Sequence, residues 1–95
     1  MKYRSEFGKE LEGIFLYAAK NRKLLREFLQ DLLSPAEYKD LSIRWQIVKL
    51  LNKKVPHRDI SKKLRVSVAT VTRGSRELLN KKGGFKQVLQ KYKNS

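Results

Sequence analysis

Apolar residues recur every three or four positions along most of the chain, which is the spacing of one face of an α-helix. In the N-terminal part this spacing is followed by Phe7, Leu11, Ile14, Phe15 and Ala18. It is interrupted by the polar stretch KNRK and then resumes in the leucine-rich stretch LLREFLQDLL. Two helices are therefore predicted, at about residues 4–19 and 22–32.

The next helix has a well-defined start signal in the sequence SPAE. Ser34 suits the N-cap, Pro35 suits the first helical position, and Glu37 completes a capping box. The helix is predicted to run to about Leu51. Its apolar face is too broad for a surface helix, so we expect it to be buried on most sides.

Pro56 ends that helix, and two short helices are predicted after it, at residues 57–64 and 68–78, with Ser67 as the cap of the second. A tight three-residue turn between two short helices is the layout of a helix-turn-helix. The stretch VSVATVT is rich in β-branched residues and would also suit a strand, but its apolar positions do not alternate strictly. The residues expected to lock the two helices together are Ile60, Leu64, Val66 and Val71. With a last helix at 83–93, the predicted fold is all-α, with six short helices.

The composition argues against several kinds of site. The chain has no cysteine and one histidine, His57, which argues against a disulfide framework and against a metal site. No stretch approaches 18 uninterrupted apolar residues, and the first residues lack the apolar core of a secretory signal. We therefore expect a cytoplasmic, nucleoid-associated protein that does not act at a membrane.

Charge is distributed unevenly along the chain. The 23 basic and 9 acidic residues give a net charge of +14. Residues 1–52 hold 10 basic and 7 acidic residues, net +3, whereas residues 53–95 hold 13 and 2, net +11. Such a charge attracts polyanions, so the C-terminal half is expected to face double-stranded DNA. A solvated lysine-rich surface that serves solubility is the alternative interpretation.

If the two short helices bind DNA, the second enters the major groove with its N-terminus first. Small side chains there let the backbone approach base edges, and the cations around them reach phosphates. Val71 is assigned to the core, whereas Val68 suits either the core or the groove. Arg65 stands in the turn where glycine is common, which predicts a strained or altered turn. The expected DNA contacts are Arg58, Ser61, Lys62, Lys63, Arg65, Val68, Ala69, Thr70, Thr72 and Arg76.

Four motifs, LSPAE, RWQIV, HRDISKKL and ATVTRGS, resemble the tryptophan repressor family over most of the chain. The resemblance implies a homodimeric repressor whose N-terminal helices intertwine and which reads a palindromic operator. It also implies a single domain over residues 1–95. In that domain, residues 1–52 are dimerisation helices, 56–79 are the helix-turn-helix and 83–93 are the C-terminal helix.

The resemblance further implies L-tryptophan or a related amino acid as a corepressor. Its indole would lie between Arg44 and Arg73, beside Gly74, with Ser34 near the ammonium group. Glu77 stands where the family has a serine, and could either bind the ammonium or pair with Arg73. The connection before the helix-turn-helix is one residue shorter than in the tryptophan-binding members.

Gly74 is unusual in the middle of a helix, where it costs about 1 kcal/mol relative to alanine. Something is therefore expected to lie flat against the backbone at this position. The ligand and a close contact with the partner subunit both remain open as explanations.

A general nucleic-acid-binding protein and an enzyme are the two alternatives to a repressor. The same basic surface would suit a nucleoid or RNA-binding protein without sequence preference. An enzyme is disfavoured because His57 and Asp59, two residues apart on a helix, cannot face each other, and because no activated nucleophile or glycine-rich phosphate loop is present.

Overall fold

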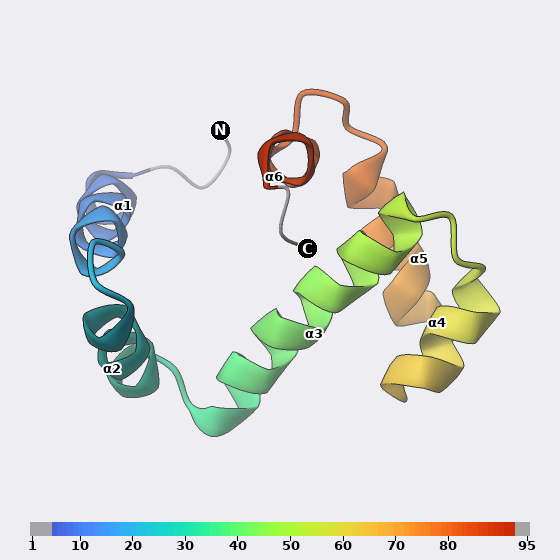
Figure 1. The fold of residues 1–95 in the computed structure, drawn as a ribbon, viewed down its shortest axis with the longest axis horizontal. Coiled ribbons are helices and arrows are strands. Elements are labelled where there is room, and N and C mark those ends of the chain that lie inside the picture. Colours follow the sequence, from blue (N-terminus) through green and yellow to red (C-terminus); the bar gives the residue numbers. More distant parts are fainter. Residues whose placement is uncertain (1–4, 93–95) are drawn as a thin grey trace. The chain divides into compact units, whose positions relative to one another are not determined.

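The computed structural model describes residues 5–92, and this part of the chain contains six α-helices and no strand (Figure 1). The helices are α1 Glu6–Ala18, α2 Arg22–Leu32, α3 Pro35–Asn52, α4 His57–Leu64, α5 Val68–Leu78 and α6 Gly84–Lys91. The all-α prediction is confirmed, and the bounds predicted for α2, α4 and α5 agree with those observed. The two ends predicted for the first and last helices, residues 4 and 93, lie outside the described residues.

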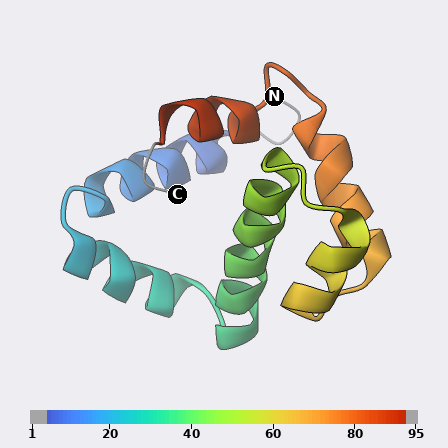
Figure 2. The same cartoon turned by 45° about the vertical axis from the view of Figure 1, so that its right-hand side comes forward.

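The chain divides into two compact units, residues 1–38 and 39–95. In the first unit α1 and α2 pack as a helical pair (Figure 2). Phe15 and Phe28 meet edge to face across this pair, with ring centroids 5.6 Å apart and planes at 89°. Ala18 is the one buried residue among those described in this unit. The pair therefore leaves most of its apolar side chains accessible to solvent.

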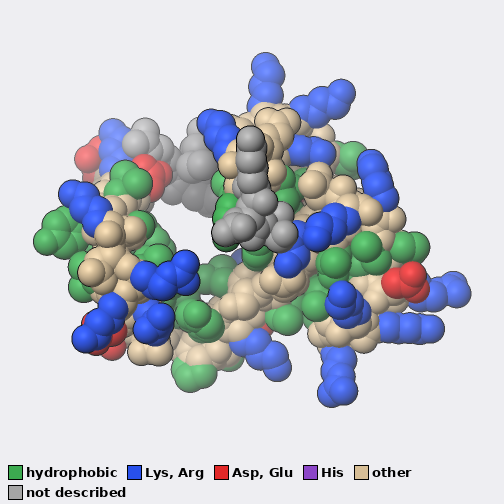
Figure 3. Space-filling model, in the orientation of Figure 1, with side chains coloured by type: hydrophobic (Ala, Val, Ile, Leu, Met, Phe, Trp, Pro, Cys, Tyr) green, Lys and Arg blue, Asp and Glu red, His purple; other side chains and the backbone are tan. Residues whose placement is uncertain are grey.

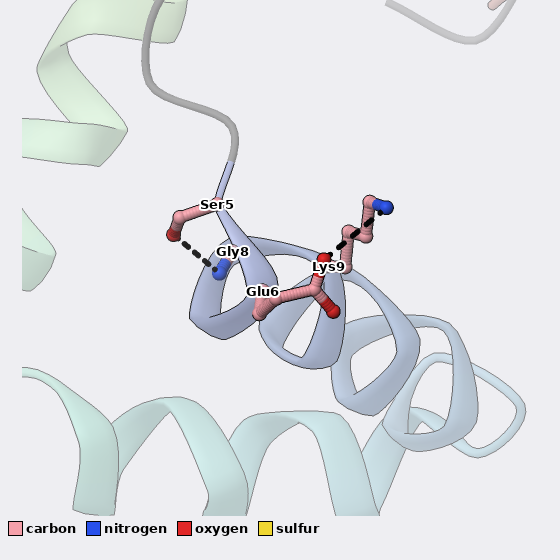
Figure 4. A network of polar contacts seen from close by, with 4 residues as sticks. All are labelled: Ser5, Glu6, Gly8 and Lys9. Carbon is pink, nitrogen blue, oxygen red and sulfur yellow. Dashed lines mark hydrogen bonds and ion pairs between the residues drawn. The ribbon is translucent and has the colours of Figure 1, made fainter.

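Both helices of this pair begin at side-chain caps. Ser5 accepts a hydrogen bond from the Gly8 N–H at 3.1 Å, and the adjacent Glu6 and Lys9 form an exposed ion pair at 3.5 Å (Figure 4). Asn21 accepts the Leu24 N–H at 3.0 Å at the start of α2. Each cap satisfies an N–H that has no partner within the helix.

The start of α3 is the predicted capping box. The Ser34 N–H donates to Glu37 Oε1 at 2.8 Å, and the Glu37 N–H donates to Ser34 Oγ at 3.2 Å. The pKa of Glu37 is lowered, chiefly by the hydrogen bond from the Ser34 backbone N–H and secondly by the Ser34 side chain. Both bonds favour the charged carboxylate.

The expected burial of α3 on most sides is wrong for the single chain. Ile47, Val48 and Leu50 are buried, but side chains nearer the start of the helix, such as Leu41 at 47 % exposure, are accessible. The reason is that the core of the second unit gathers around the C-terminal part of α3 only.

In the second unit, α4 and α5 pack against each other and against the end of α3, and α6 packs on α5. The buried cluster consists of Ile47, Leu50, Ile60 and Val71, surrounded by Ile43, Leu51, Val55, Leu64 and Val66. Of the four residues predicted to lock the two short helices together, Ile60 and Val71 belong to the buried cluster, and Leu64 and Val66 are partly buried and pack against it. Across residues 5–92, no helix combines the length and the apolar character needed to cross a membrane.

Candidate nucleic-acid interface

The connection between α4 and α5 is a three-residue turn, residues 65–67. Arg65 ends α4 in the left-handed conformation, with φ 58° and ψ 46°, which is the altered turn that the sequence predicts. Ser67 then caps α5 by accepting the Thr70 N–H at 3.1 Å. The two helices therefore have the layout of a helix-turn-helix.

Ser61 holds this turn together. The sequence places it among the DNA contacts, but it is half-buried and its hydroxyl donates to the Val66 carbonyl. The Val66 N–H donates in return to the Ser61 carbonyl at 3.1 Å. The hydroxyl proton of Ser61 is thus used inside the protein.

The first turn of α5 presents small side chains to solvent. Val68 is 49 % exposed, and Ala69 and Thr70 are exposed as well, whereas Val71 is fully buried. Val68 is therefore outside the core of the single chain, and Val71 is in the core as expected. A surface of this kind can approach a flat partner closely because no long side chain stands in front of the backbone.

Two hydroxyls on α5 already make local hydrogen bonds. Thr72 Oγ1 donates to the Val68 carbonyl at 3.0 Å, and Thr70 Oγ1 lies 2.8 Å from Ser67 Oγ. A hydroxyl that donates one hydrogen bond still has acceptor lone pairs. Thr72 can therefore accept a hydrogen bond from an outside donor without breaking its contact with Val68.

Cations surround this surface. The exposed basic residues of α4, the turn and α5 are Arg58, Lys62, Lys63, Arg65, Arg73 and Arg76. Within the described part of the chain, none of their side chains forms an ion pair or a hydrogen bond. Figure 3 shows Lys and Arg side chains projecting from the α4 and α5 side of the molecule, with few acidic groups among them.

The charge difference follows the two units. Residues 39–95 hold 16 basic and 3 acidic residues, net +13, whereas residues 1–38 hold 7 and 6, net +1. The electrostatic attraction for a polyanion therefore comes almost entirely from the unit that contains α4 and α5.

Gly74 in α5 lies against α3 of the same chain. A Cβ atom built on Gly74 would come within 2.9 Å of Ile47 Cγ2 and 3.7 Å of Leu51 Cδ1. This contact adds a third explanation for the glycine, which is packing within the subunit. The space beside Gly74 is taken by Ile47.

The other residues of the expected ligand site are accessible. Arg44, Arg73 and Glu77 are all exposed, and no ion pair joins Glu77 to Arg73 in the region that the structure describes. Ser34 belongs to the first unit, where its hydroxyl is engaged in the capping box. It borders a shallow hollow of about 440 Å³ lined by Arg26, Gln30, Leu33, Ser34, Pro35 and Tyr38.

Lys54 is not among the residues predicted from the sequence. This residue has φ 66°, the second positive φ among the described non-glycine residues besides Arg65. The sequence does contain a signal for this turn, because the same three-residue pattern occurs twice. Lys54-Val55-Pro56 before α4 and Arg65-Val66-Ser67 before α5 each combine a basic residue, a valine and the residue that precedes a helix.

The chain is similar to known proteins over most of its length. Residues 13–93 match the model of the Trp repressor protein family. A Trp operon repressor homolog of Mannheimia succiniciproducens is 40% identical over 70 residues, which are 73% of this chain and 69% of that protein. A Trp operon repressor homolog of Chlamydia trachomatis serovar L2 is 43% identical over 70 residues, or 68% and 74% of the two chains. A third, from Actinobacillus succinogenes, is 50% identical over 54 residues, or 56% and 54%. No solved structure matches the chain significantly. The family match and the agreement of the helical fold lead to one conclusion: this chain belongs to the Trp repressor family.

Proposed function

We propose that this protein is a homodimeric transcriptional repressor that binds a palindromic DNA operator through α4 and α5. Members of its family are regulatory DNA-binding proteins rather than enzymes. The observation that carries the proposal is the exposed first turn of α5, whose small side chains are flanked by cations that have no ion-pair partner in the described part of the chain. No group within residues 5–92 competes with DNA for these cations.

The side chains divide into two roles. Val68, Ala69, Thr70 and Thr72 face the base edges of the major groove, where short side chains allow close or water-bridged contacts. The phosphate contacts that position the helix come from Arg58, Lys62, Lys63, Arg65 and Arg76. Ser61 acts indirectly, by holding the turn that orients α5.

The partner subunit is a second copy of this chain, joined through residues 1–52. The support is the apolar surface that the first unit leaves accessible, with Phe7 86 % exposed, Leu16 73 % and Tyr17 64 %. Exposed apolar patches of this kind mark interfaces. A two-fold dimer presents two copies of α5 to half-sites about 34–36 Å apart.

The side chains of the expected corepressor site fit an amino acid. The guanidinium groups of Arg44 and Arg73 can stack on an aromatic face or hold a carboxylate, and the Glu77 carboxylate can hold an ammonium group. Gly74 adds no open space, because Ile47 fills it. We therefore propose that L-tryptophan or a related amino acid binds at Arg44, Arg73 and Glu77, with Ser34 of the partner subunit nearby.

A competition experiment tests DNA recognition. Duplexes are selected from a random pool by the full-length protein, and the labelled winner is competed with a scrambled duplex and with duplex RNA at moderate salt. We expect a palindromic winner preferred by a factor on the order of 10³ or more. Equal competition by all three nucleic acids would instead support the alternative, a general nucleoid or RNA-binding protein.

Calorimetric titration tests the corepressor. L-Tryptophan and other amino acids are titrated into the wild-type protein and into the Arg73→Ala variant, with and without the selected duplex. We expect one amino acid to bind the wild type, to bind more tightly when DNA is present, and to lose affinity in the variant. If no amino acid releases heat under either condition, this part of the proposal is wrong and DNA recognition stands without it.

A further inference from the structure

Helix α4 is preceded and followed by two turns of the same construction. Residues 53–56 connect α3 to α4, with the shared pattern at 54–56, and residues 65–67 connect α4 to α5. In each turn a basic residue with positive φ is followed by a valine and then by the extended residue that starts the next helix. The φ angles of the basic residues, Lys54 and Arg65, are 66° and 58°.

The valine N–H groups of the two turns make corresponding hydrogen bonds. The Val55 N–H donates to the Leu50 carbonyl at 3.1 Å, and the Val66 N–H donates to the Ser61 carbonyl at 3.1 Å. A bond that spans five residues behind a left-handed residue is the Schellman ending of a helix. Both valines pack against the same core, so the backbone of each turn is fixed from inside the unit.

The left-handed position in such a turn is normally glycine, because a side chain there is strained. Lysine and arginine have none of the local hydrogen bonding that makes asparagine tolerable at this position. Nevertheless both turns carry a cation, and both side chains are exposed and without a protein partner among residues 5–92. A strained conformation that recurs with the same charge points to a function of that charge.

We propose that Lys54 and Arg65 are paired phosphate contacts, one at each end of α4, which hold this helix across the backbone of bound DNA. The eight residues of α4 span about 12 Å, close to the width of the major groove, so the two cations engage separate phosphates. This inference rests on the proposed DNA binding and adds Lys54 to its contacts. It also explains why arginine, and not glycine, stands at position 65 in the turn between α4 and α5.

The experiment separates charge from backbone strain by replacement with glycine. Lys54→Gly and Arg65→Gly remove a cation and relieve the left-handed strain in the same step. Arg65→Lys keeps the charge. Lys20→Gly is the control, because Lys20 is an exposed cation in the connection between α1 and α2, does not have positive φ, and places its Nζ 5.4 Å from the centre of the Tyr17 ring.

Affinity for a mixed-sequence DNA duplex is measured against salt concentration, together with the Tm of each variant. We expect the slope of log K, the DNA association constant, against log salt concentration to become shallower by about 0.9 in both the Lys54→Gly and the Arg65→Gly protein. We expect Arg65→Lys and Lys20→Gly to keep the wild-type slope. The Tm should stay level or rise in the first two variants, whereas Lys20→Gly lowers it by about 2 to 6 °C.

Two results would overturn the inference and are distinct from failure of the proposed function. If the wild type binds the duplex and the glycine variants keep its slope, the cations do not contact phosphates. If the Tm of both glycine variants falls as that of the control does, the two cations stabilise the C-terminal ends of their helices, where positive charge is favourable, and are not there for DNA. A wild-type protein that does not bind the duplex at all contradicts DNA binding itself.

Discussion

At the scale of single residues, Gly74 is a point where α5 lies close against α3. Ile47 is β-branched, so the position of its Cγ2 is set by one stiff side-chain torsion and cannot easily move aside. With this atom 2.9 Å from the place of a Cβ, even alanine must push the helices apart. Gly74 therefore allows α5 to lie close to α3.

Gly74→Ala should destabilise the protein although alanine is the better helix former. The gain in helix propensity is about 1 kcal/mol, but overpacking of a core costs about 1 to 3 kcal/mol, so the free energy of unfolding should fall by up to about 2 kcal/mol. The control is Gly13→Ala in α1, where nothing lies within 4 Å of the new Cβ and the change should stabilise by about 0.5 to 1 kcal/mol. Urea unfolding of both variants measures the difference.

A double-mutant cycle tests whether Ile47 is the cause. Ile47→Leu removes the branch at Cβ at nearly constant volume, so Gly74→Ala should cost less in that background, by about 1 kcal/mol. Additive effects of the two substitutions would show that the strain at Gly74 comes from elsewhere.

The sequence could identify Gly74 as anomalous but not what it contacts. A helical position that disfavours glycine is visible locally, whereas its neighbour Ile47 lies on a different helix and is brought there only by folding. The same limit applies to Ser61. The motif predicts a place near the DNA groove for Ser61, but its bond to Val66 depends on the left-handed turn between them.

At the scale of the elements, the helix ends were the most predictable feature because their signals are local. Ser34, Pro35 and Glu37 predict the start of α3, and the structure has the reciprocal bonds of the capping box there. The left-handed backbone of Lys54 could not be predicted in this way, because lysine is not a residue that favours turns. Only the comparison of the two turns around α4 reveals it.

The capping box should make the start of α3 sensitive to acid. The carboxylate of Glu37 accepts the Ser34 N–H, which lowers its pKa below the usual 4.5. A lowered pKa in the folded state means that the stabilisation is complete above the unfolded pKa and is lost as pH falls through the folded one. The Tm advantage of the wild type over Glu37→Gln should therefore be present at pH 7 and vanish in strong acid.

Ser34→Ala separates the two hydrogen bonds in this box. The larger contribution comes from the Ser34 backbone N–H, which the substitution retains, so the pKa of Glu37 should return only part of the way towards its usual value. Carbon NMR titration of the Glu37 side chain measures this. A complete return to the usual value would assign the effect to the hydroxyl instead.

At the scale of the whole molecule, one unit carries nearly all of the net charge and the other carries the larger share of the exposed large apolar side chains. Residues 39–95 hold nearly all of the net positive charge, whereas residues 1–38 are close to neutral and expose large apolar side chains. A cationic unit suits DNA, and it repels a second copy of itself. A near-neutral apolar unit suits self-association, so the two tasks do not oppose each other on one surface.

This division leads to a prediction about assembly. Phe7→Glu and Leu16→Glu replace side chains that are 86 % and 73 % exposed in the single chain, so neither should disturb the fold of one subunit. Placed in an apolar interface, however, an unpaired carboxylate costs several kcal/mol. Sedimentation equilibrium should therefore find the wild type as a dimer and both variants as folded monomers at micromolar concentration.

The consequence for DNA follows from linkage between the two sites. A monomer reaches only one half-site, so the variants should lose affinity for the selected duplex by a factor on the order of 10² to 10⁴ while the α4 and α5 surface stays intact. Lys23→Glu, on the exposed polar side of α2, is the control for added negative charge and should remain a dimer. If the wild type itself sediments as a stable monomer, the apolar surface of residues 1–38 has another partner, and a palindromic operator loses its structural basis.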